Sequence, residues 1–240
     1  MEAAFKILHK EADKLSTADL LDWAFARFHP RLALACSFQA EESVLIDMIY
    51  RRCATDFRFF TLDTGRLNQE TYDCMDAIRE HYGVQIEVFF PDAAGVEKMA
   101  RENGLNPFYK SVELRKLCCG VRKVEPLNRA LKDLDAWMTG LRREQAVTRA
   151  AVRRIELDED HGNIIKINPL VDWSYDDVWD YIRKNNVPYN RLHKQGYPSI
   201  GCAPCTRAVK LGEDVRAGRW WWENQYTKEC GLHVRALPNV

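Results

Sequence analysis

Short apolar runs alternate with helix-like segments along most of this chain, and that alternation limits the possible folds more than any other feature. The first apolar run, Arg31-Leu-Ala-Leu-Ala35, lies between His29-Pro30 and a polar turn that begins at Cys36. Strands separated by helices form right-handed βαβ units, which build a parallel sheet. We therefore predict an α/β fold. The predicted strands are 31–35, 56–62, 85–90, 136–139 and 164–168, and the predicted helices are 2–14, 17–28, 41–52, 68–82, 94–103, 119–133 and 172–186.

Length and charge exclude several classes of protein. The chain has 240 residues, which suits one large domain, and 35 basic side chains balance 35 acidic ones. Zero formal net charge argues against a nucleic-acid partner. No apolar run is long enough to span a membrane, and residues 1–14 lack a signal-peptide core, so we expect a cytoplasmic protein without a membrane partner. The oligomeric state stays open, and a homo-oligomer is allowed.

The composition changes after Pro188, where Gly, Pro, Cys, Arg and Trp dominate. We therefore divide the chain into an α/β domain over 1–210 and an irregular, mobile C-terminal tail over 211–240.

Four of the eight cysteines have spacings typical of metal chemistry. Cys118 and Cys119 are adjacent, while Cys202 and Cys205 form a C-x-x-C pair among glycines and prolines. Four thiolates can bind zinc or an iron–sulfur cluster. Adjacent cysteines fit the separate iron corners of a cubane better than one small ion. We therefore predict one 4Fe-4S cluster per chain, with four unrelated reduced cysteines as the alternative.

Three segments after predicted strands carry groups suited to anion binding. Ser37-Phe-Gln-Ala-Glu-Glu-Ser43 opens a helix whose first amides attract negative charge, but it has no Walker lysine. Leu62-Asp-Thr-Gly-Arg66 and Thr139-Gly-Leu-Arg-Arg-Glu-Gln145 combine a glycine turn with arginines. Each segment alone also fits a plain turn; their common place at strand ends predicts a ligand site. The candidate binding residues here are Ser37, Phe38, Gln39, Leu62, Thr64, Gly65, Arg66, Gly140, Arg142 and Arg143.

Cys230 lies in the polar segment Lys228-Glu-Cys-Gly-Leu-His233. Nearby positive charge lowers the pKa of a thiol, so this cysteine is a candidate nucleophile, with an incidental free thiol as the alternative. The other three cysteines lie in apolar strand or helix contexts and are assigned structural roles; they are Cys36, Cys53 and Cys74.

Together these segments resemble the assimilatory sulfonucleotide reductases, and within them the iron–sulfur adenylyl-sulfate type. The resemblance covers residues 31–235. It also includes Cys118-Cys-Gly-Val-Arg-Lys123, Gly201-Cys-Ala-Pro-Cys-Thr-Arg207 and Gly218-Arg-Trp-Trp-Trp222. One mild departure is Ala146, where many members have serine.

The resemblance implies an adenine-nucleotide α-hydrolase-like sheet, related to the PP-loop ATP pyrophosphatases, in which Phe38-Gln39 replace a Gly-Gly pair. It implies reduction of adenosine 5′-phosphosulfate (APS) to sulfite and AMP. It also implies that Cys118, Cys119, Cys202 and Cys205 hold the cluster, and that Lys123, Arg216, Arg219 and His233 contact the phosphosulfate.

The expected chemistry is substitution at sulfur. The Cys230 thiolate attacks the sulfate sulfur, AMP leaves, and a cysteine S-sulfonate remains. No second cysteine lies nearby in the sequence, so we expect thioredoxin or glutaredoxin to release sulfite. Nothing in this mechanism requires electrons from the cluster, so we expect the cluster to have a structural or electrostatic role. The alternatives are reduction of the 3′-phosphorylated substrate, an ATP pyrophosphatase such as a tRNA thiolase, and an iron–sulfur sensor that binds DNA.

Overall fold

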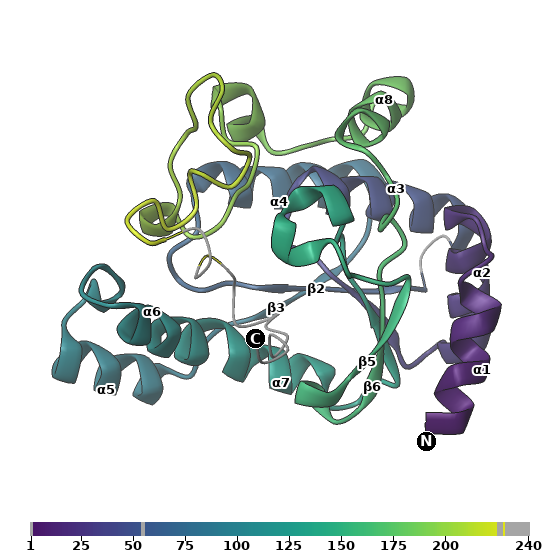
Figure 1. Ribbon diagram of the computed structural model, residues 1–240, viewed down its shortest axis with the longest axis horizontal. Coiled ribbons are helices and arrows are strands. Elements are labelled where there is room, and N and C mark those ends of the chain that lie inside the picture. The colour runs from purple at the N-terminus through teal and green to yellow at the C-terminus, as the bar shows by residue number, and fades with distance from the viewer. Residues whose placement is uncertain (1, 54–55, 225–227, 229–240) are drawn as a thin grey trace.

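A twisted sheet forms the centre of the computed structural model, which describes residues 2–53, 56–224 and 228 (Figure 1). The sheet has six strands in the order β3-β2-β1-β4-β6-β5 within these residues. Every pair is parallel except β5 with β6. The predicted parallel sheet is confirmed, and β5 is an additional antiparallel edge strand. The strands are β1 (Leu32–Ala35), β2 (Arg58–Leu62), β3 (Ile86–Phe89), β4 (Ala136–Met138), β5 (Ile155–Asp158) and β6 (Ile164–Ile167).

The helices begin and end at residues with clear local causes. Ser16 caps one helix, its Oγ accepting a hydrogen bond from the Asp19 amide at 3.2 Å, and Ser174 caps another. Gly83 ends a third at a φ of 66°, as predicted from the sequence. The helices are α1 (Glu2–Ala12), α2 (Thr17–Phe28), α3 (Ala40–Cys53), α4 (Gln69–Tyr82), α5 (Ala93–Asn103), α6 (Val112–Cys119), α7 (Glu125–Leu131) and α8 (Tyr175–Asn185).

Both faces of the sheet are covered, because side chains alternate along each strand. Leu34 of β1 is fully buried in the larger core, which includes residues of α2, α3, α4 and α8. Its neighbour Ala33 points to the opposite face and packs with Leu127 and Leu131 of α7. In Figure 1, α3, α4 and α8 lie on one side of the strands and α7 on the other. The two cores leave the carboxyl ends of the strands as the place for loops.

The helix predicted at 119–133 differs from the observed one. Helical structure begins earlier, at Val112, because the Ser111 Oγ accepts a hydrogen bond from the Leu114 amide at 3.2 Å. A π-helical turn, Gly120–Val124, then separates α6 from α7. One wider turn of this kind changes the direction of the side chains that follow, and such turns are common at functional sites.

Residues 188–224 form an irregular layer beside the sheet, containing two short 3₁₀ turns and one bridge between Thr206 and Arg219. Part of the predicted tail packs closely: Trp220 is 1% exposed, and Glu223 forms an ion pair with Arg115 of α6 at 2.9 Å. The remaining tail, residues 225–227 and 229–240, lies outside the described residues.

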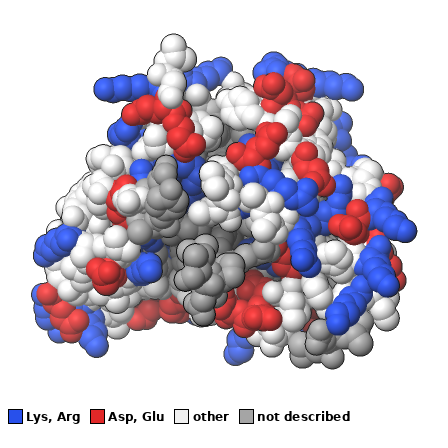
Figure 2. Space-filling model, in the orientation of Figure 1, with Lys and Arg blue, Asp and Glu red and all other residues white. Residues whose placement is uncertain are grey.

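The surface visible in Figure 2 mixes basic and acidic side chains rather than gathering one sign into a stripe. Within the part of the chain that the structure describes, no helix combines the length and apolar character needed to cross a membrane.

Candidate functional site

The three predicted loops meet at one edge of the sheet. They follow β1, β2 and β4, which are adjacent parallel strands, so their carboxyl ends lie side by side. A cavity opens there with about 1330 Å³ of free space, counting the part open to solvent. Of the predicted binding residues, those that line it are Ser37, Gln39, Leu62, Thr64, Lys123, Gly140, Arg142, Arg216 and Arg219.

The cavity combines an apolar wall with cations. Phe60, Leu127 and Trp137 line one part, as expected for a site that accepts a planar ring. Arg216 and Arg219 line another part and are only 8% and 6% exposed. Partly desolvated cations bind anions more strongly than solvated ones do. A molecule with a flat ring at one end and negative charge at the other fits this lining.

In the first loop, Phe38 does not line the cavity. Its side chain is fully buried in the larger core, and its backbone has a φ of 56°, unusual for a bulky residue. This conformation turns Ser37 and Gln39 toward the cavity. The Gln39 Oε1 also accepts a hydrogen bond from the Ile200 amide at 2.7 Å, which ties the loop to the irregular layer.

Two adjacent glutamates of α3, Glu41 and Glu42, also line the cavity, although each is only 7% exposed. Burial, and next the charge of Glu41, raise the pKa of Glu42 to about 7. The Glu42 Oε2 accepts hydrogen bonds from the Ser37 Oγ at 2.8 Å and the Gln39 amide at 3.2 Å. The sequence pattern does not distinguish these glutamates as site residues, because acidic residues in a first helical turn are common for helix stability alone.

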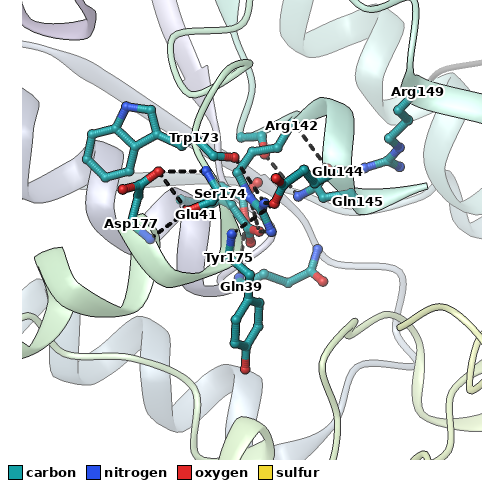
Figure 3. Close-up of polar contacts among 12 residues, drawn as sticks. Gln39, Glu41, Arg142, Glu144, Gln145, Arg149, Trp173, Ser174, Tyr175 and Asp177 are labelled. Atoms are coloured by element: carbon teal, nitrogen blue, oxygen red, sulfur yellow. Dashed lines mark hydrogen bonds and ion pairs between the residues drawn. The ribbon is translucent and has the colours of Figure 1, made fainter. Parts of the chain in front are cut away.

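The two arginines after β4 point in different directions. The Arg142 guanidinium donates to Glu41 Oε1 at 2.9 Å and to the Trp173 carbonyl at 3.2 Å, inside the network drawn in Figure 3. Arg143 does not line the cavity: it donates to the Val152 carbonyl at 2.9 Å and pairs with Asp172. Of the predicted pair, only Arg142 reaches the cavity, and its charge is already partnered.

The loop after β2 links this cavity to a second one. Gly65 makes the turn at a φ of 69°, and the Arg122 Nη1 donates to the Thr64 carbonyl at 2.6 Å. The Thr64 Oγ1 lies 3.3 Å from Cys202 Sγ. Arg66 faces away from the large cavity; its guanidinium donates to the Leu105 carbonyl at 3.2 Å and to the Asn106 side chain at 2.7 Å.

The second cavity, with about 390 Å³ of free space, is lined by all four predicted ligand cysteines, namely Cys118, Cys119, Cys202 and Cys205. No disulfide joins cysteines in the described part of the chain. Within those same residues, no three His, Cys, Asp or Glu side chains are gathered around one point as a single metal ion would require. Four thiols around a shared space, with cations beside them, fit a group larger than one ion.

The two cavities share a wall. Lys123, Cys202 and Arg219 line both of them. Lys123 is placed there by the π-helical turn Gly120–Val124. The Arg219 guanidinium stacks 4.7 Å from the centre of the Trp220 ring and donates to the Ile200 carbonyl at 2.9 Å. The anion end of the large cavity is thus next to the cysteines.

The predicted nucleophile and one predicted contact residue, Cys230 and His233, lie outside the described residues. The nearest described position is Lys228, whose carbonyl accepts a hydrogen bond from the Arg216 Nη2 at 2.8 Å. The chain therefore passes the cation end of the cavity two residues before Cys230.

The cysteines assigned structural roles differ from a reactive thiol. Burial raises the pKa of Cys36 well above its ordinary value, and burial raises that of Cys74 to about 12. Neither is a thiolate near neutral pH, so neither is a ready nucleophile. The side chain of Cys53 lies outside the described residues.

Comparisons with known proteins agree with this geometry. The family model of the phosphoadenosine phosphosulfate reductase domain matches residues 31–208. A Burkholderia cepacia protein named adenosine 5′-phosphosulfate reductase is 51% identical over 229 residues, covering 95% of this chain and 91% of that protein. The crystal structure of a phosphoadenylyl-sulfate (PAPS) reductase from Candida auris, a phosphate complex, superposes with a TM-score of 0.71 at 31% identity, covering 85% of this chain and 95% of that one.

A more distant likeness extends the comparison to fold alone. Candida glabrata FMN adenylyltransferase, in complex with FAD and inorganic pyrophosphate, superposes with a TM-score of 0.56 at 14% identity, covering 93% of this chain and 77% of that one. The α/β fold predicted from the sequence is confirmed. The matched domain and the sequence identity to the Burkholderia cepacia protein show that the chain belongs to the phosphoadenosine phosphosulfate reductase domain family.

Proposed function

We propose that this protein is an enzyme that reduces APS to sulfite and AMP in the assimilation of sulfate. The observation that carries the proposal is the contact between Arg216, a cation of the cavity, and the Lys228 carbonyl. Two peptide units separate Lys228 from Cys230, so their Cα atoms can be no more than about 7 Å apart. The described chain thus reaches the cations of the cavity two residues before the candidate nucleophile in the sequence. The relative from Burkholderia cepacia is named for the same activity.

The lining supports a division of roles. The apolar wall around Phe60 and Trp137 accepts the adenine ring, and the cations Lys123, Arg216 and Arg219 accept the phosphosulfate. Two anions, a thiolate and a sulfate ester, must approach each other during the reaction. The cations lower the repulsion between them and stabilise the charge that grows on the bridging oxygen.

The reaction proceeds in two substitutions. The Cys230 thiolate attacks the sulfate sulfur, the bond from sulfur to the bridging oxygen breaks, and AMP leaves with the electron pair. A thiolate from an external dithiol then attacks the Cys230 sulfur, and sulfite leaves. The second thiol of the donor resolves the mixed disulfide, which oxidises the donor to a disulfide and restores Cys230. We propose thioredoxin, or glutaredoxin, as this donor. We propose the cytoplasm as the compartment, since thiols are kept reduced there.

The four cysteines of the second cavity would hold one 4Fe-4S cluster, which would contribute structural support and an electrostatic influence on the shared wall. Lys123 and Arg219 line that wall, so they balance the negative charge of a tetrathiolate site on one side and orient the phosphosulfate on the other. Lys123 and Arg219 thus act as a pair of cations held between two anionic sites.

The test is incubation with ³⁵S-labelled APS without a donor, followed by mass spectrometry of the intact protein. The wild type should carry one sulfonate adduct on Cys230, and Cys230→Ser should carry none while still binding AMP. Cys53→Ser is the matched control and should be labelled like the wild type. An adduct on Cys36 or Cys74, or turnover by Cys230→Ser near the wild-type rate, would contradict the proposal.

A further inference from the structure

The apolar wall of the large cavity depends on a polar contact made behind it. Among the three side chains named for that wall, Phe60, Leu127 and Trp137, only Trp137 carries a polar atom. Trp137 is 1% exposed, and a buried indole N–H needs a hydrogen-bond acceptor. Its Nε1 donates to the Asp158 Oδ2 at 2.9 Å. A carboxylate at the end of β5 therefore sets the orientation of a residue that lines the cavity.

The Asp158 carboxylate is itself held in place. The 3₁₀ turn Glu159–His161 follows β5, and residues three apart in such a turn lie on the same side, which brings His161 back to Asp158. The His161 Nδ1 lies 2.8 Å from the second carboxylate oxygen, Oδ1, and the side chains of His161 and Asp158 are only 5% and 9% exposed. The Asn163 amide donates to the Asp158 carbonyl at 2.8 Å and closes the loop. Both carboxylate oxygens thus have a partner in a closed hairpin loop.

The charges around Asp158 keep it ionised. Burial would raise the pKa of this carboxyl, but the hydrogen bond and charge of His161, the charge of Lys166 and the bond from Trp137 outweigh burial and lower the pKa. Lys166 is the partner of Trp137 in the pairing of β6 with β4, and its Nζ lies 5.2 Å from the centre of the indole ring. An ionised carboxylate is a stronger hydrogen-bond acceptor than a neutral one. The indole is therefore held by a cation over its ring and an anion at its N–H.

We propose that Asp158 is a positioning residue for the adenine end of the cavity, because it binds the N–H of Trp137 and leaves the hydrocarbon surface of the indole for the ligand. Neither Asp158 nor His161 lines the cavity, so the effect on the ligand passes through Trp137. The inference rests on the proposed function only in that the cavity binds an adenine nucleotide. It gives the edge strand β5 a role in binding, since β5 supports the wall from the far side of β6 (Figure 1).

The test is calorimetric titration of the anaerobically purified protein with AMP, together with KM and kcat for release of sulfite from APS. Asp158→Ala should weaken AMP binding by about tenfold, the order expected for loss of one hydrogen bond to a charged group. The adenine ring keeps its contacts while the bond at sulfur breaks, so KM should rise by a similar factor and kcat should change by less than about twofold. Asp158→Asn keeps an oxygen that can accept from the indole and an amide that can donate to His161. It should therefore bind AMP within about threefold of the wild type.

Asp160→Ala is the matched control, because it removes the same charge from an exposed side chain on the same turn, and it should bind AMP like the wild type. Trp137→Phe removes the N–H, so it should also weaken AMP binding, and adding Asp158→Ala to it should cost less than about twofold more.

The inference is overturned if folded Asp158→Ala binds AMP like the wild type, if Asp158→Asn is as weak as Asp158→Ala, or if Asp160→Ala shows the same loss. A fall in kcat at unchanged KM, or a full further loss in the Trp137→Phe background, also overturns it. Wild-type AMP affinity in Trp137→Phe overturns it even where Asp158→Ala does not fold. Absence of AMP binding in the wild type overturns the proposed function as well, which separates the two failures.

Discussion

Gly201→Ala should displace Arg219 and slow the enzyme. A Cβ at this position would lie 2.6 Å from the Arg219 Cζ, where about 3.4 Å or more is ordinary van der Waals contact. The guanidinium must therefore move by about 1 Å. Its hydrogen bond to the Ile200 carbonyl, now 2.9 Å, would then be lost or strained.

The cost has two parts. Moving a cation from about 4 to 5 Å from an anion loses about 0.8 kcal/mol at an effective dielectric of about 20. Loss of a charged hydrogen bond that holds the cation adds about 1.5–3 kcal/mol. The sum, about 2–4 kcal/mol, corresponds to a fall in kcat/KM of roughly 30- to 800-fold. Arg219→Ala removes the same cation and should cost a similar amount.

Release of sulfite from APS, with a saturating small-molecule dithiol as donor, measures the effect. Gly95→Ala is the matched control, since a Cβ there meets only ordinary contacts, the nearest at 3.5 Å. In a double-mutant cycle, Gly201→Ala should cost little once Arg219 is already alanine. A fall in kcat/KM of less than threefold in Gly201→Ala, or an equal fall in the Arg219→Ala background, would refute this explanation.

Three further outcomes are expected. Anaerobically purified protein should contain about four iron atoms per chain, and stoichiometric zinc without iron would rule out the proposed cluster. Glu223→Gln should lower the free energy of unfolding by about 3–5 kcal/mol, because it removes the carboxylate charge that is paired with the buried Arg115 guanidinium. In the same chemical denaturation, Glu11→Gln should cost less than about 1 kcal/mol, because Glu11 forms an exposed pair with Arg27. The pKa of Glu42 is raised from 4.5 to about 7, so the folded state holds this proton more tightly than the unfolded state does. As the pH rises from about 4 to 8, the free energy of unfolding of the wild type should therefore fall by about 3 kcal/mol relative to that of Glu42→Gln. Parallel curves of unfolding free energy against pH for the two proteins would contradict the raised pKa.

The place of the site followed from the sequence, because hydrophobic alternation identifies strand ends without any knowledge of tertiary contacts. The edge strand β5 did not, since Ile155–Asp158 is short and only its first residue is buried. An antiparallel edge strand pairs through its backbone, and its side chains carry little signal. The π-helical turn was also missed, because local sequence does not distinguish it from α-helix.

The direction of individual side chains was the least predictable part. Arg142 and Arg143 are neighbours of the same type, yet only the first reaches the cavity, because Asp172 and the Val152 carbonyl hold the second elsewhere. Phe38 was grouped with the loop that contains it, but its ring is fully buried in the core. Partners that lie far away in the sequence decide such orientations, and a single chain read along its length does not reveal them.

The order of segments along the chain has a consequence for synthesis on the ribosome. Every strand of the described sheet ends by Ile167, whereas the wall formed by Ser199, Gly201, Arg216 and Arg219 comes later. At about 5–20 residues per second, the ribosome needs several seconds more to make that wall. During this interval a nascent chain can hold a complete sheet with this edge uncovered and only two of the four proposed ligand cysteines made. Binding of the proposed cluster, and closure of the cavity around a nucleotide, would therefore wait until this last part of the polypeptide has left the ribosome.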